Sequence, residues 1–261
     1  MEETPADINR IIEALGNLID DFSRFWDENG NPDPESGNSP AVIIETLVNL
    51  LEMLYAHETG VHPIGEGATG TSLSRAPRLD PIGEGELNEL GNYGLSLLDS
   101  LEIDTGSINY PSHQSFGDLA FPLALWLARN DGEIEELGPV VNALARTANR
   151  LSHPEELEGL FSQSSEILHA VSPILIQDPE QHTDGAPWAM MLFNRGIIAT
   201  RSTIPELIEA AYKELVEQLP LGASDFFCEA TEQMELLAYP SHVRAIVERY
   251  YNEWGVKKLL H

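Results

Sequence analysis

Hydrophobic residues recur at intervals of three and four along most of the chain, which is 261 residues long. The pattern is clearest in residues 8–25, where the apolar positions fall on one face of a helix. These positions are Ile8, Ile11, Ile12, Leu15, Leu18, Ile19, Phe22 and Phe25. Thr4, Pro5 and Asp7 supply an N-cap residue, a first-turn proline and a first-turn acid, and Gly30 lies just past the end. The run therefore predicts an amphipathic helix.

Residues 41–57 distribute their polar side chains differently. The polar and small positions form one narrow stripe, and the remaining positions are apolar. The stripe consists of Glu45, Asn49, Glu52 and Ala56. A helix of this kind is expected to be covered on most sides, so we place it at the centre of the fold, with Ser39 as its cap and Pro40 at its first position.

Eight further stretches with helical periodicity complete a prediction of about ten helices. They are 86–102, 115–130, 133–151, 154–171, 187–201, 204–219, 224–238 and 241–255. Capping boxes at Ser152-x-x-Glu155 and Thr203-x-x-Glu206 are expected to open two of them, and Pro122 is expected to kink or restart its helix. Since no stretch alternates like a strand, the sequence predicts an all-α fold of stacked antiparallel hairpins, either helical-repeat-like or a large bundle.

Two segments, 26–38 and 58–85, lack this periodicity and are rich in turn-forming residues. The second is a long Gly/Pro loop, and a loop of this length within a compact domain is usually functional or disordered. A third break at 172–186 indicates a boundary. We expect an N-terminal helical subdomain at 1–171 and a C-terminal helical-hairpin subdomain at 187–261, either separate or packed as one continuous domain.

A phase of 34 residues relates two segments near the C-terminus, which begin at Pro205 and at Tyr239. The first segment, together with Gly196, resembles in outline one tetratricopeptide unit, a helix–turn–helix repeat. The matching small, aromatic and proline positions are Gly196, Ile208, Tyr212, Leu215 and Pro220. The second copy departs from that repeat, because His242 and Arg249 stand where small residues are expected. The resemblance therefore implies stacked helical hairpins.

The chain is strongly acidic, with 43 Asp and Glu residues against 14 Lys and Arg residues and a net charge of -29. Proteins that bind nucleic acids draw affinity from basic residues that neutralise phosphates, so we expect neither DNA nor RNA as a partner. Attraction to an anionic membrane surface is disfavoured for the same reason. Solubility accounts for such a surface, and the scarcity of lysine also fits a salt-rich environment.

The sequence also bears on the compartment. Cys228 is the only cysteine, so an internal disulfide or a cysteine-based zinc site is excluded. The first residues, MEETPADINR, lack the basic and apolar regions of a signal peptide. The longest apolar run, at 120–128, is too short to span a bilayer. Together these features predict a cytoplasmic protein with no membrane partner.

Residues 65–72, GEGATGTS, match the phosphate-binding pattern GxxxxGK[ST] except at the lysine, where Thr71 stands. A phosphate-binding loop also needs a buried strand before it and a helix after it. Here a predicted helix precedes the glycines, and Pro77 and Pro81 follow them. We therefore interpret these residues as part of a glycine-rich loop and not as a nucleotide site.

The candidate ligand-binding residues carry imidazole or guanidinium groups in or beside the 58–85 loop. They are His57, His62, Arg75 and Arg78. Histidines with a carboxylate such as Glu58 can bind zinc or iron, but these two histidines are five positions apart, with Gly60 between them. That spacing does not match the helical motif of zinc proteases, so we predict no metal and no cofactor.

The sequence contains no complete catalytic constellation. Glu166-x-x-His169 supplies one of the two such motifs that a di-iron bundle requires. Cys228 lies between apolar residues, which is typical of a buried and inert thiol, and no GxSxG nucleophile motif occurs. We predict no catalytic residue.

Two function classes remain. The first is a protein–protein interaction or scaffold module that binds a protein partner or associates with itself, because helices follow one another in series. The alternative is an enzyme or a small-ligand or metal-binding protein, with its site where the 58–85 loop folds over the helix at 41–57.

Overall fold

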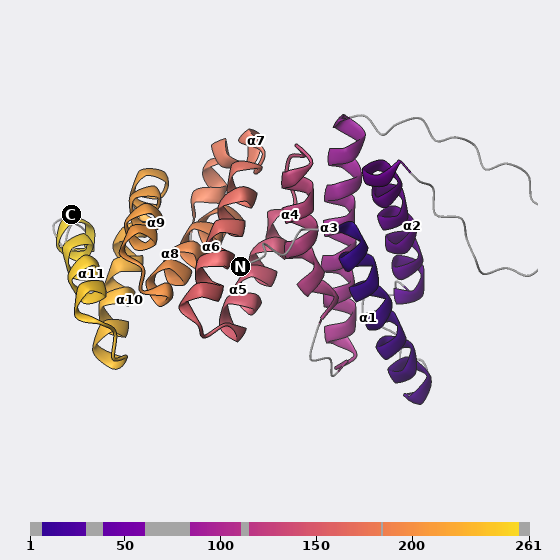
Figure 1. Ribbon diagram of the computed structural model, residues 1–261, viewed down its shortest axis with the longest axis horizontal. Helices are drawn as coiled ribbons and strands as arrows, with labels where there is room; N and C mark the ends of the chain where they lie inside the picture. The colour runs from indigo at the N-terminus through magenta and orange to yellow at the C-terminus, as the bar shows by residue number, and fades with distance from the viewer. Residues whose placement is uncertain (1–6, 30–38, 61–83, 111–114, 184, 256–261) are drawn as a thin grey trace, which may run out of the picture. The chain divides into compact units, whose positions relative to one another are not determined.

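The computed structural model describes residues 7–29, 39–60, 84–110, 115–183 and 185–255. Every regular element within these ranges is a helix, and the ranges contain no β-strand (Figure 1). This confirms the predicted all-α fold. Contacts between Cα atoms group the chain into two compact units, Thr4–Pro139 and Val140–His261.

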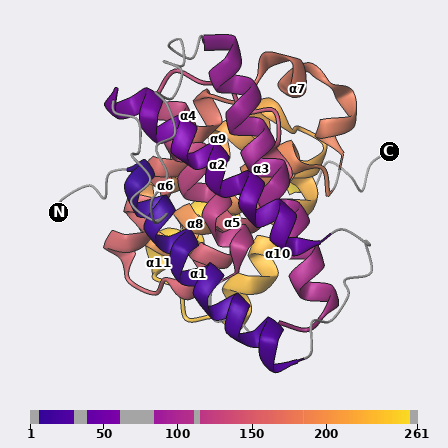
Figure 2. The same ribbon diagram turned by 90° about the vertical axis from the view of Figure 1, so that its right-hand side faces the viewer.

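The first unit is built from four α-helices and one short 3-10 helix in its described residues. They are α1 (Ile8–Glu28), α2 (Pro40–Thr59), α3 (Glu84–Ser107), η1 (Phe116–Leu119) and α4 (Ala120–Arg129). Helix α3 packs against α2 and α4, and α1 packs against α2 and α4. Figure 2 shows α1, α2 and α3 lying side by side.

Asp7 caps α1, because its carboxylate accepts a hydrogen bond of 2.9 Å from the backbone nitrogen of Asn9. The buried side chains of α1 follow the predicted stripe. They are Ile8, Ile11, Leu15, Leu18 and Phe22. The cap at Asp7 corrects the prediction that Thr4 is the N-cap and Asp7 a first-turn acid, because the helix begins only at Ile8; Thr4 and Pro5 themselves lie outside the described residues.

The most buried helix of the first unit is α4, which corrects the central place expected for residues 41–57. The buried side chains of α2 lie along one face, and Val42 on the same helix is 61% exposed. In α4, seven of ten residues are buried, and Trp126 is fully enclosed. Both helices are rich in apolar residues, but apolar composition does not specify how many neighbouring helices cover each one. The sequence therefore could not show that α4 is covered on more sides than α2.

Pro122 lies in the first turn of α4, directly after η1. A proline there removes a backbone N–H that has no intrahelical acceptor, so it begins a helix without the cost it carries in a helix interior. The expectation that Pro122 restarts its helix is confirmed.

The second unit continues the series of helices. Its elements are α5 (Leu137–Arg150), α6 (Pro154–His169), α7 (Pro173–Gln177), η2 (Pro179–His182), α8 (Pro187–Ser202), α9 (Pro205–Gln218), α10 (Gly222–Leu236) and α11 (Ser241–Trp254). Helix α8 packs against α6 and α9, and α11 packs against α10 and α9. Residues 203–204 and 237–240 are the connections within two successive hairpins, α8–α9 and α10–α11 (Figure 1).

Proline also fixes the start of α6. Pro154 occupies the first helical position, so His153 is the N-cap, and its backbone nitrogen donates to Oε2 of Glu156 over 3.3 Å. The capping box expected at Ser152-x-x-Glu155 is therefore wrong by one residue. The fixed φ of proline, and not the serine side chain, sets the register.

The same correction applies to α9. Pro205 is its first residue and Ile204 is its N-cap, so Thr203 does not cap this helix. Thr203 instead ends α8 with a φ of 60°, in the left-handed region. The backbone reverses within two residues there, which produces the α8–α9 hairpin.

The structure bears differently on the predicted loop at 58–85 and on the predicted boundary at 172–186. Residues 61–83 of the 58–85 loop lie outside the described residues, while 58 and 59 belong to α2 and 84 and 85 to α3. The break expected at 172–186 contains α7 and η2, and the two compact units divide between Pro139 and Val140.

Candidate functional site

The residues predicted from sequence to bind a ligand are mostly not described. His57 lies in the last turn of α2, where its side chain is exposed. His62, Arg75 and Arg78 lie outside the described residues, so a site formed by the four remains a prediction. In the part of the chain that the structure describes, no group of three or more His, Cys, Asp and Glu side chains is arranged to hold a metal ion.

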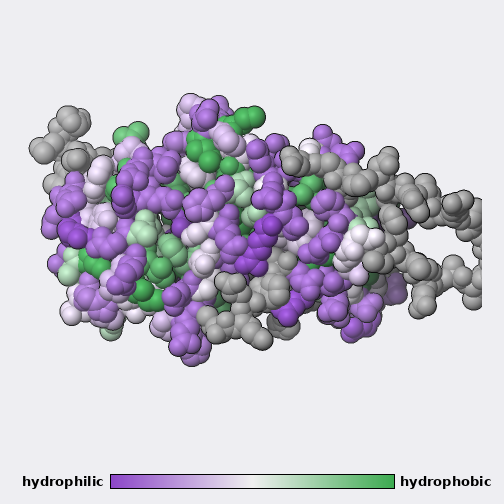
Figure 3. All heavy atoms as spheres, turned by 45° about the horizontal axis from the view of Figure 1, so that its top comes forward, coloured by the Kyte–Doolittle hydropathy of each residue, from purple (hydrophilic) through white to green (hydrophobic). Residues whose placement is uncertain are grey.

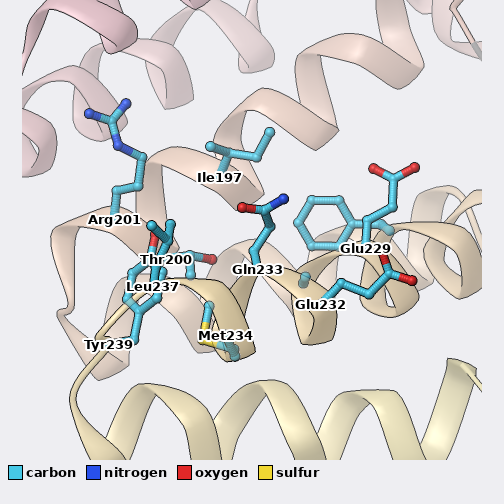
Figure 4. Close-up of a pocket in the computed structure, with 11 residues that line it drawn as sticks. Ile197, Thr200, Arg201, Glu229, Glu232, Gln233, Met234, Leu237 and Tyr239 are labelled. Carbon is cyan, nitrogen blue, oxygen red and sulfur yellow. The ribbon is translucent and has the colours of Figure 1, made fainter.

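A pocket of about 580 Å³ lies in the second unit between α8 and α10 (Figure 4). Helix α8 contributes Ile197, Thr200 and Arg201. Helix α10 and the segment after it contribute Phe226, Glu229, Ala230, Glu232, Gln233, Met234, Leu237 and Tyr239. Its volume falls within the range of protein ligand sites, which is roughly 300–1,000 Å³.

The lining includes several apolar side chains and remains open to solvent. Ile197 is 45% exposed and Leu237 is 49% exposed, whereas Met234 is buried. On the face shown in Figure 3, apolar residues emerge in patches among the hydrophilic residues of the second unit. Exposed apolar side chains that line a hollow are typical of a surface that binds another molecule.

Phe226 is held firmly where α10 faces α8. Its ring stacks on Phe193 with centroids 5.8 Å apart and an interplanar angle of 7°. Gly196 allows this approach, because a Cβ atom at position 196 would lie 2.7 Å from Cζ of Phe226. A larger residue at 196 would displace the ring that forms one wall of the pocket.

Tyr212 of α9 packs against Phe226, the residue that forms this wall of the pocket. It is fully buried, and its ring meets Phe226, Phe227 and Tyr250 edge to face at centroid distances of 5.7, 5.0 and 5.1 Å. Its hydroxyl lies 2.7 Å from the hydroxyl of Thr200, which lines the pocket. One aromatic side chain thus links α8, α9, α10 and α11.

Arg201 forms the basic end of the pocket. Its guanidinium donates to the carbonyl oxygens of Ala148 (2.7 Å) and Leu151 (2.6 Å), at and just after the end of α5. Burial raises the pKa of Tyr239 above its ordinary value, and the nearby positive charge of Arg201 opposes that shift. Arg201 therefore ties α8 to the end of α5 and places a cation beside Tyr239.

Arg244 holds the segment that closes the pocket. Its Nε donates to the carbonyl oxygen of Tyr239 (3.1 Å), and one terminal nitrogen donates to that of Leu237 (3.0 Å). Both acceptors belong to pocket residues. The connection between α10 and α11 is thus fixed by a side chain from the first turn of α11.

Glu229 and Glu232 form the acidic end of the pocket. Both side chains are exposed, and Figure 4 shows their carboxylates on the far side of Gln233 from Arg201. The described lining includes no histidine, cysteine, serine or lysine. The arrangement can accept an apolar group between an anionic and a cationic end.

Alkaline pH is expected to destabilise the second unit through Tyr212, which is buried, and Tyr250, which is half-buried. Burial, followed by the hydrogen bond to Glu209 and that residue's charge, raises the pKa of Tyr250 from 10.0 to about 12. Burial also raises the pKa of Tyr212 above 10.0. The folded state therefore holds these protons to higher pH than the unfolded state does. Their stabilising contribution is complete below pH 10 and is lost as pH rises from 10 toward 12.

Urea unfolding of the second unit, followed at several pH values, measures this loss. The urea midpoint should fall across that window, and Tyr250→Phe should make the fall shallower. The chain contains five other tyrosines and three lysines, so the comparison with Tyr250→Phe is what isolates the contribution of Tyr250. A midpoint that stays constant from pH 10 to 12 would contradict the assignment.

The sequence did not identify this pocket. Ile197 and Phe226 are apolar residues within predicted helices, and periodicity assigns such residues to a core. The available signal was a second apolar stripe on α8, formed by Met190 and Ile197, which are seven residues apart and therefore on one face. These residues are 36% and 45% exposed. Such a stripe indicates a surface left uncovered or filled by a partner.

Comparisons with protein-family models, curated proteins and solved structures give no match for this chain. Among the described helices, none combines the length and the apolar composition that crossing a bilayer requires.

Proposed function

We propose that the protein is a protein–protein interaction module. Its pocket between α8 and α10 binds a segment of a partner protein that carries apolar anchor residues flanked by lysine or arginine. The single observation that supports this function is an open pocket whose exposed apolar lining is bordered by Glu229 and Glu232.

The helical framework fits this function. Successive hairpins pack against their neighbours and leave helix faces available over a continuous surface. The walls of the pocket are rigid, because Phe226 is clamped by Phe193 and Tyr212, and Leu237 is fixed by Arg244. A rigid site orders little on binding and therefore favours affinity.

The electrostatics favour a basic partner. A net charge of -29 attracts cationic segments, which speeds productive encounters, and physiological salt screens its repulsion of other acidic chains beyond roughly 8 Å. Glu229 and Glu232 then offer short-range acceptors beside the apolar lining. Binding should therefore weaken as salt screens these charges.

Fluorescence anisotropy with two labelled peptides tests the proposal. Both peptides carry the same leucine and phenylalanine anchors, flanked in one by lysine and in the other by glutamate. The basic peptide should bind. Ile197→Asp should weaken that binding by about tenfold or more, because it replaces an apolar contact of the lining with a carboxylate.

Ile103→Asp is the matched control, since Ile103 is 63% exposed and lies on α3 in the first unit. It should leave the affinity of the basic peptide unchanged. Equal affinity for the two peptides would contradict the proposed charge preference. Equal affinity of wild type and Ile197→Asp would show that the peptide binds elsewhere.

A further inference from the structure

We propose that residues 256–260 of a second copy of the chain occupy the pocket between α8 and α10, so that the protein associates with itself. This inference rests on the proposed peptide-binding function of that pocket. It identifies the partner segment and limits it to a sequence carried by the protein itself.

The composition of this segment fits the pocket. Residues 256–260 read VKKLL, and Lys257 and Lys258 are two of the three lysines in the chain. They are also the only pair of adjacent basic residues in the sequence. Leu259 and Leu260 follow directly. In this acidic chain, no other stretch joins two neighbouring cations to two large apolar residues.

The pocket supplies the complementary groups in one continuous lining. Glu229 and Glu232 offer carboxylates to the two lysines. Ile197, Phe226 and Met234 offer apolar contacts to the two leucines. Carboxylates and ammonium groups that meet beside a partly desolvated apolar surface attract more strongly than they do in open water.

The point where α11 ends indicates a second copy and not the same chain. The backbone oxygen of Gly255 accepts hydrogen bonds from Ser224 (3.4 Å) and Cys228 (3.8 Å) of α10. These two positions are about half a helical turn away from Phe226 and Gln233, which line the pocket. The segment that follows Gly255 therefore starts on the face of α10 opposite these two residues, the face that also carries Glu232 one turn beyond Cys228.

The reach of the chain supports the same conclusion. A helix with its side chains is about 10–12 Å across, so the path around half of it is roughly 17 Å. Five extended residues span at most roughly 17–18 Å. Residues 256–260 would be used up in reaching Phe226 of their own chain, and no leucine would be left to bind beside it. The pocket of a second copy carries no such constraint.

Sedimentation equilibrium of the full chain at physiological salt is the first measurement. The average mass of the wild type should rise with protein concentration. Lys257→Glu/Lys258→Glu and, separately, Glu229→Lys/Glu232→Lys should each weaken association by tenfold or more. Combining all four substitutions in one chain should restore it, because the charge pairs are exchanged and not removed.

Mixing the two double variants tests whether binding occurs between chains. Each is expected to be largely monomeric alone, and the mixture should associate, because the unaltered pocket of one accepts the unaltered lysines of the other. The control variant Glu235→Lys/Glu248→Lys changes the net charge by as much as Glu229→Lys/Glu232→Lys does, but at exposed positions outside the pocket lining. The association constant of this control should stay within about twofold of the wild-type value.

The outcomes separate this inference from the proposed function. A wild type that stays monomeric, a lysine variant that associates as strongly as the wild type, or a mixture of double variants that stays monomeric would overturn self-association. If the basic peptide still binds and Ile197→Asp still weakens it, the pocket retains its proposed function with a different partner. If neither peptide nor second copy binds, both proposals fail.

Discussion

Tyr212→Ala is expected to lower the free energy of unfolding of the second unit by about 3–5 kcal/mol, the range for removal of a buried aromatic ring. Tyr212 is fully buried, and its ring contacts Phe226, Phe227 and Tyr250. Truncation leaves a cavity where four helices meet, and the surrounding rings cannot all move to fill it. Hydrogen exchange of amides in α8–α11 at increasing urea concentration measures the loss in this unit separately.

Two companion variants divide this effect into its parts. Tyr212→Phe keeps the ring and removes the hydroxyl that meets Thr200, so it should cost about 1 kcal/mol, as for one buried hydrogen bond. Tyr93→Ala is the control, because Tyr93 is 50% exposed and should cost about 0.5 kcal/mol or less. Equal losses for Tyr212→Ala and Tyr93→Ala would contradict the role given to the aromatic cluster.

Glu214→Leu is expected to be about as damaging, at roughly 3–5 kcal/mol, because it leaves a buried cation without its counter-charge. The side chain of Arg195 is 6% exposed and forms an ion pair with Glu214. It also donates to the hydroxyl of Ser165 (2.8 Å) and lies over the ring of Phe161 at 4.7 Å. Those two contacts do not replace a carboxylate.

Arg195→Met should cost less than Glu214→Leu. The carboxylate that it leaves behind is 29% exposed and can still be hydrated. The double variant Arg195→Met/Glu214→Leu should lie closer to wild type than Glu214→Leu does, since it removes both charges and retains apolar volume. Urea midpoints of the four proteins form the thermodynamic cycle. Additive losses would show that the pair is not energetically coupled.

The helices could be predicted because their signals are local. Periodic apolar positions placed α1 on residues whose buried set, from Ile8 to Phe22, matches the predicted stripe. Prolines marked the starts of helices, since each fixes φ and lacks the N–H that a helix interior requires. Pro40 and Pro187 begin α2 and α8 in this way. Apolar spacing and proline positions can be recognised from residues close together in the sequence.

The exact caps and the centre of the first unit were less predictable. Serine and threonine patterns suggested caps at Ser152 and Thr203, but the neighbouring prolines place each N-cap one residue further along, at His153 and Ile204. The apolar helix at 41–57 was expected to lie at the centre, and α4 took that place instead. Apolar content predicts that a helix buries a face, while the number of faces covered depends on its neighbours.

The candidate site required the tertiary structure. His57 is exposed on α2, and its three proposed companions lie outside the described residues, so the loop site remains a prediction. The pocket between α8 and α10 joins Ile197 to Phe226, which are 29 positions apart in the sequence. Gly196 could be noted as a small residue, yet only the packing of Phe226 against it gave a reason for its size.

By itself, the sequence determined that the chain forms helices in series, that Pro40 and Pro187 begin two of them and that its composition is strongly acidic. These properties depend on spacing, charge and backbone preference, which short stretches specify. Only the tertiary structure decided which helix is enclosed, which cation is buried and where an apolar lining stays open. Those properties depend on contacts between residues distant in sequence, whose energies no local pattern encodes.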